Sequence, residues 1–243
     1  MSLYVYCVGD ELSESAFEGT AGVGGARVRV LSLTGRLSAV VSEAPAEPVA
    51  ATEENLLAHN RVNAAALAAT TPLPFRFGTR AAPERLAEYA ASNEAALAAA
   101  LARVRGGVEM GVKLMSKAEA AGQGAKVKSE DEADEAVGRG TAFLLKKRRE
   151  ALGGEEARAR AEGLAAWLAE GVAGLARESN VRVSPSEAIV VRAAHLVERE
   201  RVGEYRERLR GLRAARTDVR LLSSGPWPPY GFSDIGGGAE ARP

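Results

Sequence analysis

The chain has 243 residues, enough for one large or two small domains with a hydrophobic core. Its 32 basic and 32 acidic residues leave a formal net charge of zero, which predicts no general attraction to nucleic acid or anionic lipid. A single cysteine, Cys7, excludes an internal disulfide and a zinc site built from cysteines. No long apolar run or signal-peptide pattern occurs, so we expect a cytoplasmic protein that does not cross a membrane.

The first seventy residues show strand patterns and then a helix pattern. Residues 3–10 are apolar on both faces and predict a buried inner strand, and two apolar runs on either side of Thr34-Gly35 predict a hairpin. Residues 52–70 predict a helix that Thr52 caps. Five residues at spacings of three and four are predicted to share one face of this helix: Leu56, His59, Asn60, Asn63 and Leu67.

Residues 71–80, TPLPFRFGTR, alternate between apolar and polar side chains and contain two prolines. This pattern predicts an edge strand or loop, with Phe75 and Phe77 facing one way and Arg76 the other. Residues 83–107 predict one helix that begins at a proline and ends at two glycines.

The second half of the chain predicts strands and helices in a regular order. We expect a helix that starts with a capping box, Ser129 to Glu132. The basic KKRR stretch of this helix, residues 146–149, is expected to lie on a solvent-exposed face. Whether Gly153 and Gly154 break this helix stays open. The other predicted elements are a strand at 108–116, a strand at 180–184, a strand within 186–200, a helix at 201–214 and a strand at 218–225.

This order of strand, helix, strand, strand, helix, strand is that of ferredoxin-like (βαββαβ) domains. We therefore predict an α+β fold with two domains. Residues 1–105 form an N-terminal α+β domain, and residues 106–243 form a C-terminal ferredoxin-like domain with a long helical region and a GPWPPYGF tail.

Few residues have the patterns of catalysis or cofactor binding. His59 has the chemistry of a general base, but its spacing predicts a hydrogen-bonded core histidine. His195 lies in a predicted strand without a local carboxylate or cysteine, and two distant histidines are poor evidence for a metal site. Phosphate-loop and G-x-S-x-G motifs are absent. The sequence thus predicts no enzyme, metal or cofactor; the alternative is a small-molecule or enzymatic site near His59 and Arg76.

Arg76 lies between two phenylalanines that we expect to be buried. The prediction is a structural ion pair with a packed aliphatic stem, and a binding role is the alternative. The ferredoxin-like order also suggests RNA recognition, which requires exposed aromatic side chains on the central strands. The predicted strands VEMGVKLM and AIVVRAAHLV have none, so no nucleic-acid partner is expected.

The stretch GPWPPYGF, residues 225–232, combines three prolines with three aromatic residues. The prolines predict extended backbone that loses little entropy when it docks. In one interpretation, Trp227, Tyr230 and Phe232 fold back and cap a core; in the other, they present an aromatic surface to a partner.

Five stretches of this sequence resemble the gas vesicle protein family GvpF/GvpL. They are LYVYCV, LLAHNRVNAAALAATTPLPFRFGT, VEMGVKLM, GTAFLLKKRRE and LLSSGPWPPYGF, and they extend from residue 3 to residue 232. The pairing of PLPFRFGT with GPWPPYGF is the most specific feature of this resemblance.

The resemblance implies a role in gas vesicle formation. Members of this family are minor components, thought to contact the small hydrophobic shell protein of the GvpA type, and other minor gas vesicle proteins are further candidate partners. It implies two α+β domains, the second a modified ferredoxin-like fold, no catalytic residues, and a location in the cytoplasm with the vesicle. The structural or interaction residues that we select are Phe75, Arg76, Phe77, Trp227, Pro228, Tyr230 and Phe232.

Overall fold

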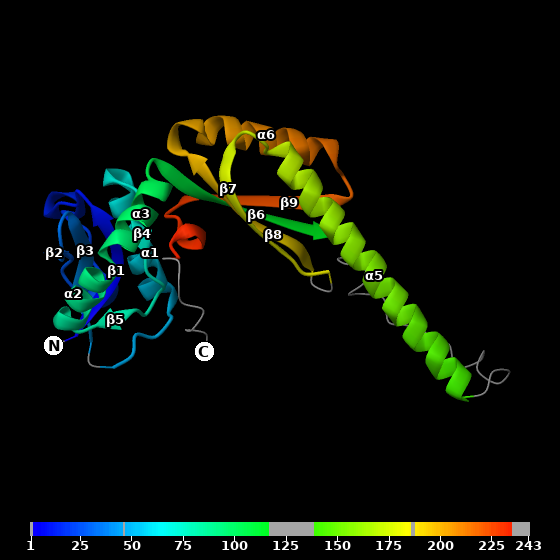
Figure 1. The fold of residues 1–243 in the computed structure, drawn as a ribbon, viewed down its shortest axis with the longest axis horizontal. Helices are drawn as coiled ribbons and strands as arrows, with labels where there is room; N and C mark the ends of the chain where they lie inside the picture. The colour runs from blue at the N-terminus through cyan, green and yellow to red at the C-terminus, as the bar shows by residue number, and fades with distance from the viewer. Residues whose placement is uncertain (1, 46, 117–138, 186–187, 235–243) are drawn as a thin grey trace. The chain divides into compact units, whose positions relative to one another are not determined.

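The computed structural model describes residues 2–45, 47–116, 139–185 and 188–234; for residues 139–153 it describes the helix but not the side chains. The chain is a mixed α+β protein with two antiparallel sheets (Figure 1). It forms two compact units. The first unit comprises residues 1–110, 196–199 and 225–243, and the second comprises residues 111–195 and 200–224.

The first unit is built around strand β1 (Leu3–Asp10), which is buried over nearly its whole length, as predicted. On one side β1 pairs antiparallel with β3 (Leu37–Glu43), which in turn pairs with β2 (Arg29–Ser32). On the other side it pairs with two short strands, β4 (Leu73–Pro74) and β5 (Arg80–Ala81). The predicted hairpin is confirmed, and Gly35 takes a positive φ of 54° in its turn, a conformation that glycine adopts without steric cost.

Helix α1 (Glu53–Ala69) begins where the sequence predicted, and the side chain of Thr52 accepts a hydrogen bond from the Asn55 amide. Its buried face differs from the predicted one, because Leu56 and Asn60 are exposed. The residues that are buried are Ala58, His59, Val62, Asn63, Ala66 and Leu67. Ala58, Val62 and Ala66 pack with β1 and with two short 3-10 helices, η1 (Glu14–Phe17) and η2 (Val23–Gly25), in a core that includes Tyr4, Tyr6 and Cys7.

The predicted single helix at 83–107 is wrong, because the chain forms two helices, α2 (Pro83–Ser92) and α3 (Glu94–Val104). Asn93 separates them with non-helical backbone angles. Its side-chain amide donates to the carbonyl of Tyr89 at 2.8 Å. Asparagine competes in this way with helical backbone bonding, so a short polar side chain ends the first helix.

The second sheet has the strand order β7-β8-β6-β9. Its strands are β6 (Gly107–Ser116), β7 (Ala176–Val183), β8 (Ile189–Glu198) and β9 (Val219–Trp227). β7 begins earlier than predicted, and β9 continues through the first three residues of GPWPPYGF. Because β9 is an edge strand, it tolerates Pro226, which cannot donate to a neighbouring strand.

Helices α5 (Arg139–Gly171) and α6 (Val202–Ala215) complete the second unit, and the 3-10 helix η3 (Arg199–Arg201) precedes α6. α5 continues unbroken across Gly153 and Gly154, which answers the question that the sequence left open. The two helices pack closely, since a methyl group on Gly171 would lie 2.5 Å from the Leu212 side chain. The predicted capping box at 129–132 lies outside the described residues, as do the side chains of KKRR.

Candidate functional site

The GPWPPYGF segment leaves β9 and packs within the first unit. Pro228 and Pro229 are buried, and Tyr230–Phe232 form the short 3-10 helix η4. Phe232 is only 5% exposed, whereas Trp227 is 45% exposed. The prediction that the aromatic residues cap a core is therefore confirmed for Phe232 and wrong for Trp227. Trp227 is the last residue of the edge strand β9, and part of its ring lies at the surface.

Tyr230 joins this segment to helix α1. Its hydroxyl lies 3.1 Å from His59 Nε2 and accepts a hydrogen bond from the Asn63 amide, also at 3.1 Å. The same amide nitrogen lies 3.0 Å from His59 Nε2. Because an amide nitrogen only donates, His59 Nε2 is an acceptor, and the proton of the neutral ring lies on Nδ1.

Two tyrosines of β1 extend this polar cluster. The Tyr4 hydroxyl lies 3.1 Å from His59 Nδ1 and accepts the Gly78 amide at 2.9 Å. The Tyr6 hydroxyl pairs with Ser42 Oγ at 2.9 Å and accepts the Val23 amide at 2.8 Å. The spacing of Tyr4 and Tyr6 puts both rings on one face of the strand, and each ring contacts His59.

Burial controls the protonation of this cluster. It lowers the pKa of His59 to about 4 and raises that of Tyr4 to about 12. It also raises the pKa of Tyr230. All three side chains are therefore neutral at neutral pH. His59 is only 2% exposed, which leaves a substrate no access to its ring. The geometry is that of a hydrogen-bonded core histidine, as the sequence predicted.

Further hydrogen bonds hold η4 in place. The Gly231 amide donates to Glu109 Oε2 at 2.6 Å, and Arg103 donates to the Phe232 carbonyl at 2.5 Å. Burial raises the pKa of Glu109, and its bond to the Gly231 amide opposes that rise. The segment is thus attached to α1, α3 and β6 by residues that all belong to the first unit.

Residues 2–234 match the family described as gas vesicle synthesis protein GvpL/GvpF. The chain belongs to this family. It is 32% identical to gas vesicle protein L of Streptomyces sp. (strain CB03234), in an alignment that covers 96% of this chain and 92% of the relative.

The fold resembles two crystal structures of gas vesicle protein GvpF. One is from Anabaena sp. PCC7120, with a TM-score of 0.76, 20% identity, and coverage of 97% of this chain and 99% of the other. The other is from Microcystis aeruginosa, with a TM-score of 0.74, 20% identity, and coverage of 96% and 99%. At this identity the likeness supports the fold alone.

In this GvpL/GvpF family member, the three candidate residues Phe75, Arg76 and Phe77 have different environments. Phe77 is half-buried, and its ring contacts His59 and Tyr4 at centroid distances of 5.7 and 6.1 Å. Phe75 is also half-buried and contacts Tyr89 at 6.4 Å. Arg76 is exposed, and no ion pair of its guanidinium with a described residue is found, so the structural ion pair stays a prediction.

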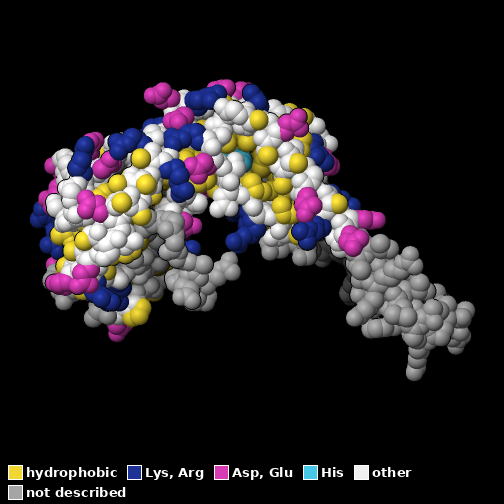
Figure 2. Space-filling model, viewed as in Figure 1, with side chains coloured by type: hydrophobic (Ala, Val, Ile, Leu, Met, Phe, Trp, Pro, Cys, Tyr) yellow, Lys and Arg dark blue, Asp and Glu magenta, His cyan; other side chains and the backbone are white. Residues whose placement is uncertain are grey.

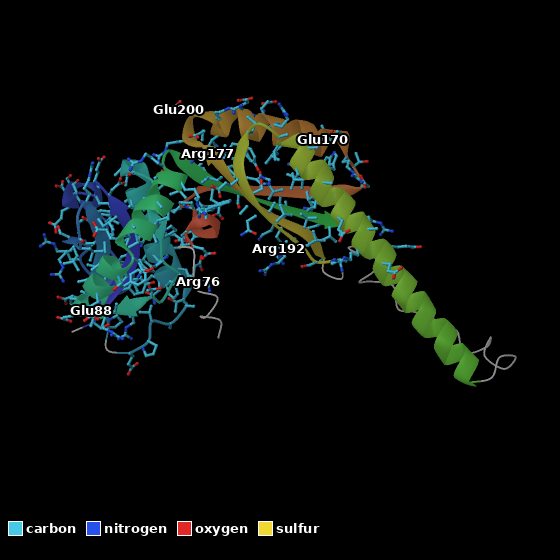
Figure 3. The ribbon with its side chains drawn as sticks, in the orientation of Figure 1. Arg76, Glu88, Glu170, Arg177, Arg192 and Glu200 are labelled. Carbon is cyan, nitrogen blue, oxygen red and sulfur yellow. The ribbon has the colours of Figure 1, made fainter. Side chains whose placement is uncertain are left out.

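The motifs PLPFRFGT and GPWPPYGF lie together in the first unit. Phe77 and Tyr230 both contact the His59 ring, and Arg76 lies at the surface of the same unit (Figure 3). The sequence analysis missed Asn63 and Glu109 as partners of the C-terminal segment. Neither position carried a local signal, because their partners lie more than a hundred residues away.

Among the described residues, no helix is long and apolar enough to span a membrane, and no group of three or more potential ligands is placed to hold a metal ion. On the face seen in Figure 2, basic and acidic side chains are interspersed over each unit.

Proposed function

We propose that this chain is a gas vesicle assembly protein or minor structural component that contacts the small shell protein while the vesicle forms. The observation that carries the proposal is the family match, which extends over residues 2–234. The vesicle role then places the protein in the cytoplasm, with other minor gas vesicle proteins as further partners. An aggregation-prone shell subunit with exposed strands and apolar faces requires a partner that covers them before assembly.

The second part of the proposal concerns the fold. We assign an N-terminal α+β domain to residues 1–105 and a modified ferredoxin-like domain to residues 106–243, with the difference that residues 106–110, 196–199 and 225–243 of this second domain pack with the first unit. In support, the elements β6, α5, β7, β8, α6 and β9 follow the ferredoxin-like order along the chain. The sheet order β7-β8-β6-β9 is also that expected for this topology.

The third part is that the protein acts without catalysis. The catalytic alternative required a pocket that gathers His59 and Arg76. His59 is buried among Tyr4, Tyr6 and Phe77, and the pocket that Arg76 lines does not include His59. These contacts favour a structural role for His59.

Exposed hydrophobic side chains are candidates for the contact with the shell protein. Trp227 is the largest of them, and exposed tryptophans are enriched among residues that dominate protein interfaces. On the second unit, Val181 of β7 and Leu222 of β9 are 40% and 39% exposed. We assign the main contact to Trp227, because its neighbours Pro228 and Pro229 are buried and hold the backbone for docking.

The test is a pull-down of the full chain co-expressed with the small shell protein of its own gene cluster. We expect the wild type to retain the shell protein and Trp227→Ala to retain severalfold less. Leu57→Ala is the matched control, because Leu57 is a similarly exposed hydrophobic residue, 49% exposed, on α1. If folded wild-type protein retains no shell protein, the direct contact is wrong. Equal loss in both variants would reject Trp227 as the specific contact.

A further inference from the structure

A pocket of about 390 Å³ lies in the first unit, and His59 is not among the described residues that line it. Its apolar lining comes from three elements: Val8 of β1, Leu73 of β4 and Leu97 of α3. Each of these side chains is almost completely buried, so together they form a closed floor beneath the pocket. The volume falls at the lower end of the range for small-molecule sites, roughly 300–1,000 Å³.

Two aromatic rings form part of the wall of this pocket. Phe75 and Tyr89 approach edge to face, with ring centroids 6.4 Å apart. Burial raises the pKa of Tyr89, which indicates that its hydroxyl is partly withdrawn from water. No hydrogen bond to this hydroxyl is present among the described residues, so it is available to a ligand.

Arg76 is the one basic residue among the described residues that line this pocket. Its guanidinium has no ion-pair partner in the part of the chain that the structure describes. The backbone that carries it is nevertheless fixed, because the Phe75 amide donates to the Tyr6 carbonyl at 2.8 Å. On the other side, Thr79 Oγ1 donates to the Arg76 carbonyl at 2.7 Å. The loop backbone is thus held on both sides of Arg76, and no described residue competes with an anion for its guanidinium.

We propose that this pocket binds a carboxylate that carries an apolar ring or branched chain, with Arg76 pairing the carboxylate. A planar guanidinium matches a carboxylate in a bidentate geometry, and the half-buried rings of Phe75 and Tyr89 contact the rest of the ligand. Such a carboxylate can belong to a free small acid or to the C-terminal residue of a peptide. Asp234 also lines the pocket, and its negative charge works against an anion there.

The experiment is calorimetric titration of the full chain with phenylacetate, phenylacetamide and acetate. Phenylacetamide has the same shape without the charge, and acetate has the charge without the ring. We expect binding of phenylacetate, and binding of the other two at least about tenfold weaker, because charge-assisted bonds and ring burial each contribute to affinity. No detectable binding of phenylacetate, or equal binding of phenylacetamide, would overturn the proposal.

Three variants locate the ligand. Arg76→Gln should weaken phenylacetate binding about tenfold or more, since it removes a charge-assisted bond. Asp234→Asn should strengthen binding severalfold, because it removes the opposing charge. Arg61→Gln is the control, an exposed arginine on α1 that does not line this pocket. Binding that Arg76→Gln leaves unchanged would refute the assignment even if phenylacetate binds.

Two peptides identify the source of the carboxylate. One ends in a free phenylalanine carboxylate, and the other has the same sequence with a C-terminal amide. Tighter binding of the free-acid peptide than of phenylacetate supports a peptide terminus as the ligand. Binding of phenylacetate alone supports a small acid. A preference for the amidated peptide would contradict the role of Arg76.

Discussion

The hydroxyl of Tyr230 lies 3.1 Å from Nε2 of His59, although 171 positions separate the two residues in the chain. This contact attaches the C-terminal segment to the first helix of the same unit. It also gives the buried imidazole a partner, which a polar group requires when it is removed from water. His59, which has the chemistry of a general base, thus helps to hold the GPWPPYGF segment in place.

Replacing Tyr230 with phenylalanine should destabilise the protein by about 1–3 kcal/mol, because it leaves His59 Nε2 and the Asn63 amide with fewer partners in a buried site. The ring is retained, so the change isolates the hydroxyl. Urea unfolding of the full chain measures the effect. Tyr89→Phe is the matched control, since the Tyr89 hydroxyl forms no hydrogen bond with a described residue and its loss should change stability by less than about 0.5 kcal/mol. Equal effects of the two substitutions would show that the Tyr230 hydroxyl contributes nothing specific.

Stability should fall as pH decreases from about 6.5 to about 4. Burial lowers the pKa of both His59 and His195 to about 4 in the folded protein, whereas an unfolded histidine binds its proton near pH 6.5. Between these values the unfolded state holds more protons, so each histidine lowers stability by up to about 1.4 kcal/mol for each pH unit of acidification. Its stabilising contribution is fully present above pH 6.5.

The pH prediction is tested by measuring the free energy of unfolding at several pH values for the wild type and for His59→Gln. The substitution lowers stability throughout, so the slope is the informative quantity, and it should be shallower in the variant. Glu109 contributes with the opposite sign, because burial raises its pKa and the folded state then takes up a proton first on acidification. Identical slopes would contradict the assignment to His59.

Much of the framework was predictable because it depends on local patterns. Strand β1, the hairpin at Gly35 and the Thr52 cap each follow from residues adjacent in the sequence. The helix break at Asn93 was not predicted, because the helical pattern continues on both sides and only the side-chain bond to Tyr89 marks the break. The ion pair of Arg76 was expected from its flanking phenylalanines, which are half-buried and leave its side chain at the surface.

The C-terminal segment shows the same limit of sequence analysis. Proline content predicted a stiff extended segment, but it could not distinguish which aromatic ring is buried. That depends on α1, α3 and β6, which contribute His59, Arg103 and Glu109 from three distant positions. Phe232 and Trp227 therefore have different roles, although they are five positions apart in one motif.

Phe232→Ala should destabilise the protein by about 3–5 kcal/mol, because it removes a buried ring and leaves a cavity. Trp227→Ala should cost clearly less, about 1–3 kcal/mol, since nearly half of its surface already contacts water. Thermal unfolding of both variants tests this contrast. A large loss of stability in Trp227→Ala would mean that the ring supports the fold, and any change in partner retention by that variant would then have a structural cause.

Gly225→Ala should be strongly destabilising, because two independent constraints act at this position. Gly225 has a φ of 109°, which side chains rarely allow, and an added methyl group would lie 2.7 Å from the backbone carbonyl of Glu109. Backbone cannot move aside as a flexible side chain can, so we expect a loss of at least about 2 kcal/mol.

Gly211→Ala is the control, since Gly211 lies on an exposed helical face with no atom within 4 Å of the added methyl group. This control should gain about 0.5–1 kcal/mol from helix propensity. Opposite signs in urea unfolding would confirm the close approach of Gly225 to β6, and a neutral Gly225→Ala would exclude it.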